Sequence, residues 1–136
     1  MFLIHGHSLS KGEVIISFDA SEFLTLGKNL GNVSKSTGAL AKIVVKKTAK
    51  DIEKSAKTLA PVDTGNLKNS ITTSDLRNVT QDSPSAEVRA SANYAQYLEF
   101  GTSVMPAQPF MGPAAEKHGP EFMAAMAEII EKAMDS

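Results

Sequence analysis

The chain has 136 residues, which fits one domain with a single core. Its 14 basic and 15 acidic side chains give a net charge of -1, so no long-range field attracts a polyanion and general nucleic-acid binding is not expected. With no cysteine, the chain cannot form disulfides, thiolate catalysts or cysteine-based zinc sites. No apolar run approaches the ~20 residues of a membrane span, so no membrane partner is expected.

The first residues differ in pattern from the rest. Residues 1–12 show no sustained hydrophobic period and contain glycines, serines and two histidines, which predicts a flexible N-terminal arm. Residues 13–136 are then expected to form a single α+β domain. Residues 13–19 cluster β-branched and aromatic side chains, which predicts a short strand that begins the core.

Two helical patterns follow the first strand. An amphipathic helix is expected from residue 20, with one apolar face made of Phe23, Leu26, Leu30 and Val33. A long helix is expected over residues 37–59, with apolar positions at Leu40, Ile43, Val44, Ile52, Ala56 and Leu59. Its lysine-rich face is interpreted as a solvated surface with i,i+4 ion pairs. Pro61 ends this helix because it disfavours the α region for the residue before it.

The remaining pattern predicts a hairpin and two more helices. Residues 67–73 and 86–91 are expected to be strands, joined by the polar stretch 75–85. Residues 93–100 predict one short helix, with Asn93 as a candidate cap and Gly101 as the stop. The last helix is expected over residues 110–134, where Gly119 and Pro120 are a candidate interruption. Its second half is expected to carry an apolar stripe made of Phe122, Met126, Ile129, Ile130 and Ala133. The fold class is therefore α+β, with a mainly antiparallel sheet of three to four strands on one long helix.

Two loop sequences stand out because they are rich in proline and glycine and keep apolar anchors. They are residues 60–67, APVDTGNL, and residues 98–113, LEFGTSVMPAQPFMGP. Prolines lower the ordering cost of binding, and anchored loops hold a defined shape. The combination indicates surfaces shaped for docking.

The triplet Asp63-Thr64-Gly65 matches the catalytic triplet of aspartic proteases, whose retroviral members dimerise to bring two carboxylates together. That chemistry requires the triplet at the tip of a β-loop, whereas here a lysine-rich helix precedes it. A turn is the favoured interpretation. A dimeric aspartic protease, or another hydrolase using Asp63, remains the alternative function.

Other chemistry has little support in the sequence. His5 and His7 would share one face of a strand, but a metal site would need His118 and a carboxylate from far along the chain. There is no phosphate-binding glycine loop and no nucleophile elbow. We therefore expect no catalytic, cofactor-binding or metal-binding residues, and no cofactor. Tyr94, Tyr97 and Phe100 could stack on bases, but without a basic groove they are better explained by packing or an interface.

Three strings, taken in order, resemble one family. They are residues 60–67, residues 94–102 (YAQYLEFGT) and residues 105–114 (MPAQPFMGPA). The family is the minor tail component family of long-tailed phages and prophages, the tail completion or head-tail joining proteins. The arm at residues 1–12 is not accounted for by the pattern, and Gly112 stands where many relatives carry a basic residue.

The resemblance implies a non-enzymatic, structural subunit that forms a ring, often a hexamer, around the DNA passage. The implied partners are other copies of itself, the head connector or head-closure protein and the tail tube protein, with DNA only passing through the lumen. The implied location is the virion neck or upper tail, with assembly in the host cytoplasm. Replacing Phe110 with Asp is expected to prevent ring formation without unfolding the monomer. The expected subunit or partner contacts are Val62, Asp63, Thr64, Gly65, Leu67, Tyr94, Tyr97, Glu99, Phe100, Gly101, Thr102, Met105, Pro106, Pro109 and Phe110.

Overall fold

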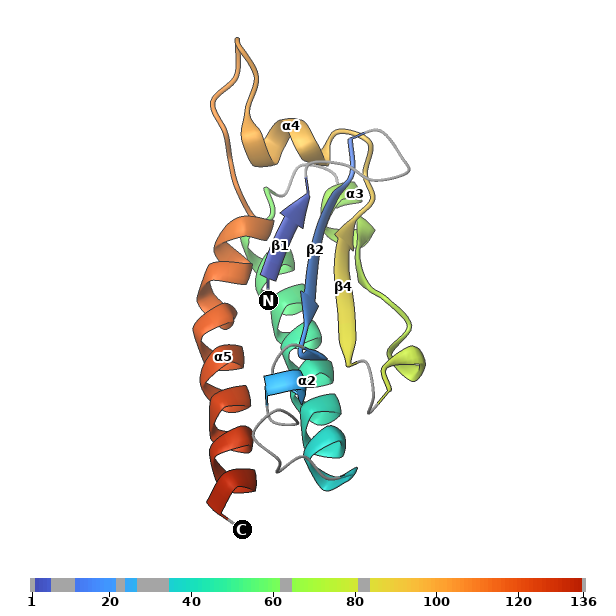
Figure 1. Cartoon of the computed structure of the whole chain (residues 1–136). Helices are drawn as coiled ribbons and strands as arrows, with labels where there is room; N and C mark the ends of the chain where they lie inside the picture. The colour runs from blue at the N-terminus through green and yellow to red at the C-terminus, as the bar shows by residue number, and fades with distance from the viewer. Residues whose placement is uncertain are drawn as a thin grey trace.

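The protein combines one sheet with two long helices (Figure 1). The computed structural model describes residues 2–5, 12–21, 24–26, 35–61, 65–80 and 84–135. The strands are β1 (Phe2–His5), β2 (Val14–Asp19), β3 (Ile71–Thr73) and β4 (Ser85–Ala90). The helices are α2 (Lys35–Leu59), α3 (Asn66–Ser70), α4 (Ala95–Phe100) and α5 (Met111–Asp135), with a 3-10 turn at Leu76–Asn78.

The sheet is antiparallel throughout, in the order β1-β2-β4-β3. Ile16 lies opposite Val88, and Ile71 lies opposite Ala90. The expected α+β class with an antiparallel sheet is therefore confirmed, as is the pairing of the two hairpin strands. Within the segment predicted to be a flexible arm, residues 2–5 pair with β2 as the edge strand β1.

The two long helices pack on the sheet and on each other (Figure 1). Helix α2 contacts β3 and β4, while α5 contacts β1 and β2. The rings of Phe18 in β2 and Phe122 in α5 meet edge to face, with centroids 5.8 Å apart. Such aromatic pairs add stability beyond their buried area, so this contact fixes α5 against the sheet.

The predicted apolar stripe of α2 is partly wrong. Ile52 and Ala56 are buried as expected, but Leu40, Ile43 and Leu59 are exposed. The buried stripe instead consists of Ala41, Val45, Ala49, Ile52 and Ala56. Small side chains let α2 approach its neighbours closely, so alanines occupy the core positions, whereas a pattern read by hydrophobicity favours leucine and isoleucine. In α5 the predicted Phe122, Met126 and Ile130 are buried.

Three boundaries differ from expectation. Residues 67–70 were expected to begin a strand, but they belong to the short helix α3 (Asn66–Ser70). Leu67 is the one apolar residue of this helix, and a single helical turn is enough to bury it. Asn93 does not cap α4, whose N-cap is Tyr94 without a side-chain bond. Helix α5 continues through Pro120, which is exposed, so water can satisfy the carbonyl group that loses its partner.

The first predicted amphipathic helix is described only in part. Residues 24–26 are helical, with Leu24 buried and Leu26 exposed, so Leu26 does not lie on a buried face. Phe23, Leu30 and Val33 lie outside the described residues. None of the helices in the described part of the chain has the length and apolar character that crossing a membrane requires.

Candidate interaction site

The second proline-rich loop extends away from the body of the molecule. Residues 101–109, here called the projecting loop, rise beyond α4 at one end of the protein, opposite the end of α5 (Figure 1). The Thr102 N–H donates to the Met105 carbonyl at 2.8 Å, and the Thr102 hydroxyl accepts from the N–H groups of Val104 and Met105. These bonds give the tip of the loop a defined turn.

Glu99 fixes the base of the projecting loop. Its carboxylate Oε1 accepts from the N–H groups of Phe110 and Met111 at 3.1 and 2.8 Å, and Oε2 accepts from Gly112 at 3.0 Å. These donors belong to the start of α5, where backbone N–H groups have no helical partner and the helix dipole favours a negative charge. Glu99 is only 5% exposed. One carboxylate therefore joins α4 to α5 across the loop.

Two further contacts hold the same base. The Gln108 N–H donates to the Leu98 carbonyl at 2.7 Å, so a hydrogen bond joins the C-terminal part of the loop to α4. Gly101 ends α4 with φ 77°, and its N–H donates to the Tyr97 carbonyl at 2.8 Å. A Cβ at Gly101 would lie 2.8 Å from the Ala107 nitrogen. The expected stop at Gly101 is confirmed, and the close crossing of the chain explains the need for glycine.

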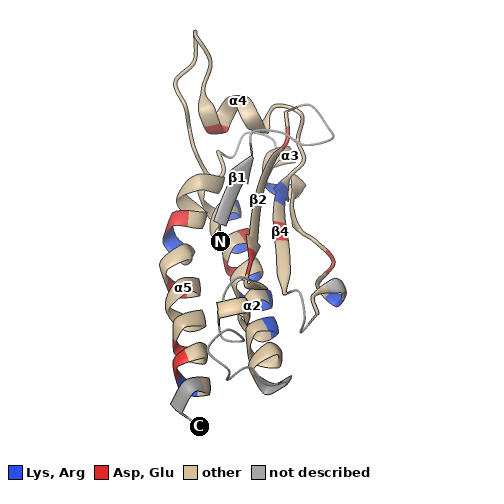
Figure 2. Ribbon diagram, in the orientation of Figure 1, with Lys and Arg blue, Asp and Glu red and all other residues tan. Residues whose placement is uncertain are grey.

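The exposed surface here is apolar and uncharged. From residue 90 to residue 115 the only charged side chain is Glu99, which is buried. Figure 2 shows a single acidic band on α4, which contains Glu99, and no charged residue on the loop, whereas acidic and basic bands recur along the two long helices. Tyr97, Phe100 and Val104 are 54%, 52% and 93% exposed. Depletion of charge with exposed aromatic side chains is typical of the centre of a protein interface.

The predicted contact residues divide into three groups. The first group is exposed or half-exposed and consists of Tyr94, Tyr97, Phe100, Gly101, Thr102, Met105, Pro106 and Pro109. The second group is buried and consists of Leu67, Glu99 and Phe110. Val62, Asp63 and Thr64 lie outside the described residues, and Gly65 begins α3 with φ 83°.

Burial changes one expectation and adds one residue. Phe110 is fully buried in the core, so an aspartate there would unfold the protein rather than only block association. The earlier expectation for this substitution is therefore wrong. Val104 was missing from the predicted contacts although it is the most exposed large apolar side chain among the described residues. Its position within an uncharged, proline-containing loop sequence could have identified Val104 as a contact residue.

A protein-family model described as "Bacteriophage HK97-gp10, putative tail-component" matches residues 25–101, more than half of the chain. The match places the protein in a family of phage tail-component type, which confirms the resemblance seen in the sequence. The chain belongs to the HK97-gp10-like family. The match covers α2 to α4 and ends where the projecting loop begins. No curated protein and no solved structure matches the chain.

Proposed function

We propose that this tail component is a structural, non-enzymatic subunit of the head-tail junction, which assembles into a ring, often a hexamer, around the DNA passage. Membership of a phage tail-component family supports the structural role. The observation that carries the proposal is the projecting loop: an uncharged, half-apolar surface held rigidly at its base by Glu99.

The shape of the site suits a head-to-tail contact. In a closed ring, one surface of each subunit meets a different surface of the next. A loop at one end of an elongated subunit provides the first of these surfaces, and its fixed base lowers the ordering cost of docking. The neighbouring copy is its first proposed partner. The head connector or head-closure protein and the tail tube protein are the proposed neighbours above and below, and the proposed place is the virion neck or upper tail.

The ring proposal is tested by removing exposed apolar area without touching the core. The double variant Phe100→Asp with Val104→Asp is expected to fold normally but to sediment as a monomer, because two desolvated charges oppose the contact. The matched control is Ile43→Asp, which changes a 61% exposed apolar residue of α2 and should leave rings intact. Sedimentation velocity and negative-stain microscopy report the result. Intact rings in the double variant would refute the loop assignment.

The substitution Asp63→Asn distinguishes the proposed structural role from the alternative, a hydrolase that uses Asp63. The triplet at residues 63–65 stands between the ends of two helices, α2 and α3, rather than on a loop between strands. We expect the variant to leave both assembly and the processing of virion proteins unchanged. A proteolytic function for Asp63 predicts instead that cleavage of virion proteins stops.

A further inference from the structure

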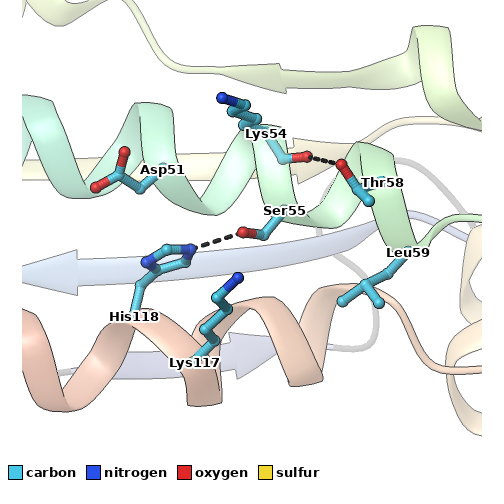
Figure 3. A pocket seen from close by; sticks show the side chains of 7 residues that line it. All are labelled: Asp51, Lys54, Ser55, Thr58, Leu59, Lys117 and His118. Atoms are coloured by element: carbon cyan, nitrogen blue, oxygen red, sulfur yellow. Dashed lines mark hydrogen bonds between the residues drawn. The ribbon is translucent and has the colours of Figure 1, made fainter.

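Helices α2 and α5 line a pocket of about 360 Å³ (Figure 3). It is lined by Asp51, Lys54, Ser55, Thr58, Leu59, Lys117 and His118. The role proposed for the loop does not use this pocket, so it needs a separate explanation.

His118 is held in one orientation at the pocket. Its side chain is 11% exposed, its Nε2 lies 2.7 Å from the Ser55 hydroxyl, and its Nδ1 lies 3.3 Å from Glu121 Oε2. In Figure 3 the imidazole points from α5 toward Ser55, with its second nitrogen on the side of Asp51. When the Ser55 hydroxyl accepts the Nε2 hydrogen, the lone pair of Nδ1 faces the carboxylates.

We propose that Asp51, His118 and Glu121 bind a divalent transition-metal ion, with Zn²⁺ the best fit, that joins α2 to α5. The three ligand atoms lie within 4.8 Å of one another. Two carboxylates and one neutral imidazole balance the charge of a divalent ion, and water can complete the coordination. The imidazole favours Zn²⁺ over Mg²⁺ or Ca²⁺, which prefer oxygen ligands alone.

The spacing requires only a small movement. Ligands about 2.1 Å from a shared ion are roughly 3.4 Å apart in tetrahedral geometry, close to the observed distance between Nδ1 and Glu121 Oε2. The side chain of Glu121 is 64% exposed and that of Asp51 is 32% exposed, so both carboxylates can shift inward. Paired ligands from facing helices, including a His and a Glu three residues apart, are a known way of building metal sites between helices.

A lysine competes for the same carboxylate. Lys47 Nζ lies 2.7 Å from Asp51 Oδ2, with the lysine side chain 74% exposed. A lysine ammonium is charged at neutral pH, so it occupies a coordination position of this carboxylate. An incoming metal ion must displace it. Removing the Lys47 charge should therefore strengthen metal binding, an effect that a purely structural role of this cluster does not predict.

The same contacts do not build a hydrolytic triad. Ser55 lies near the C-terminal end of α2, where the backbone N–H groups are already used in helical hydrogen bonds. An acyl-transfer site needs such donors free, next to the nucleophile, to stabilise the oxyanion. Ser55 is therefore assigned as a positioning residue that orients His118.

Zinc titration by calorimetry on the full chain tests the proposal. His118→Asn, Asp51→Asn and Glu121→Gln should each weaken Zn²⁺ binding by about 100-fold or more, whereas Ser55→Ala should weaken it by about tenfold because it only orients a ligand. Lys47→Gln should strengthen it several-fold. Melting curves with and without Zn²⁺ provide a second measurement, since a ligand that binds only the folded state raises the Tm.

The other two histidines of the chain supply the control. The double variant His5→Ala with His7→Ala should bind Zn²⁺ as the natural chain does, and Glu116→Gln, an exposed carboxylate on α5, should have no effect. Zinc binding that survives in the His118 variant but disappears in the double histidine variant would overturn the proposal. So would an absence of zinc binding to the natural chain at millimolar concentration. Neither outcome bears on the ring.

Discussion

The projecting loop and the pair of long helices use charge in opposite ways. At the loop one buried carboxylate, Glu99, organises the backbone and the surface is uncharged. Along the helices, exposed charges pair with each other, as Lys47 does with Asp51 at 2.7 Å and Lys132 with Glu128 at 3.0 Å. Exposed ion pairs contribute little stability but keep a surface solvated. The difference in charge supports the proposal that the loop end, rather than the charged faces of the helices, is the surface for association.

The largest expected effect separates the two phenylalanines at the base of the loop. Phe110→Asp removes a fully buried ring and places a charge in the core, so it should destabilise the fold by more than the ~3–5 kcal/mol typical of Phe→Ala. Phe100→Asp, at a position 52% exposed, should leave the midpoint of chemical denaturation nearly unchanged. Equal loss of stability in both variants would contradict the difference in burial.

The role of the buried carboxylate gives the next effect. Glu99→Gln keeps the shape of the side chain but removes the charge that accepts three N–H bonds at the start of α5, and it should cost about 2 kcal/mol. Glu116→Gln, an exposed carboxylate of the same helix, should change stability by less than about 0.5 kcal/mol. Urea denaturation compares them. A neutral result for Glu99→Gln would remove the proposed link between α4 and α5.

Two glycines with similar positive φ but different ψ sharpen the contrast between the loops. Gly65 has φ 83° and ψ -8°, the left-handed helical region, where an L-residue costs about 1–2 kcal/mol. Gly101 has φ 77° and ψ 177°, a region that is essentially restricted to glycine. A Cβ at Gly65 meets nothing closer than 3.8 Å, whereas one at Gly101 meets the Ala107 nitrogen at 2.8 Å. Gly101→Ala should therefore lower the Tm more than Gly65→Ala. The reverse order would show that the loop does not cross α4 so closely.

The smallest expected effect concerns an exposed ion pair at the 3-10 turn Leu76–Asn78, outside both the projecting loop and the long helices. The hydrogen bond from Arg77 lowers the pKa of Asp75 below its ordinary 3.8. A carboxyl whose folded-state pKa is lowered stabilises the fold above its unfolded pKa and loses this contribution as pH falls through the lowered value. The stability difference between the natural chain and Asp75→Asn should be small and constant near neutral pH, decline as the pH falls below ~4, and disappear below the lowered folded-state pKa. Acid denaturation curves measure it, and a difference that grows on acidification would have the wrong sign.

Much of the fold could be predicted because local patterns determine it. The spacing of apolar residues located α2 and the buried stripe of α5, and Gly101 marked the end of α4. The buried face of α2 was predicted wrongly, because alanines such as Ala41 and Ala49 occupy core positions and are less hydrophobic than the exposed leucine and isoleucine residues beside them. Helix α3 was not predicted, because its single buried residue, Leu67, cannot produce a repeating hydrophobic pattern.

The site was only partly predictable, because its geometry depends on contacts between distant residues. The loop sequence was recognised, but the sequence alone did not show that Glu99 faces inward toward α5. A lone carboxylate within a long uncharged stretch just before a helix was the available signal. The approach of Ser55 to His118, 63 residues apart, has no local signal, since it depends on how α2 and α5 pack.

The long axis of the subunit runs from the tip of the projecting loop to the last turn of α5 (Figure 1). A small fluorescent or heavy-atom label attached after α5 would therefore sit far from the loop and leave it unobstructed. In electron micrographs of assembled particles, such a marker would reveal the polarity of each subunit, and so whether the loop faces the capsid or the distal tip.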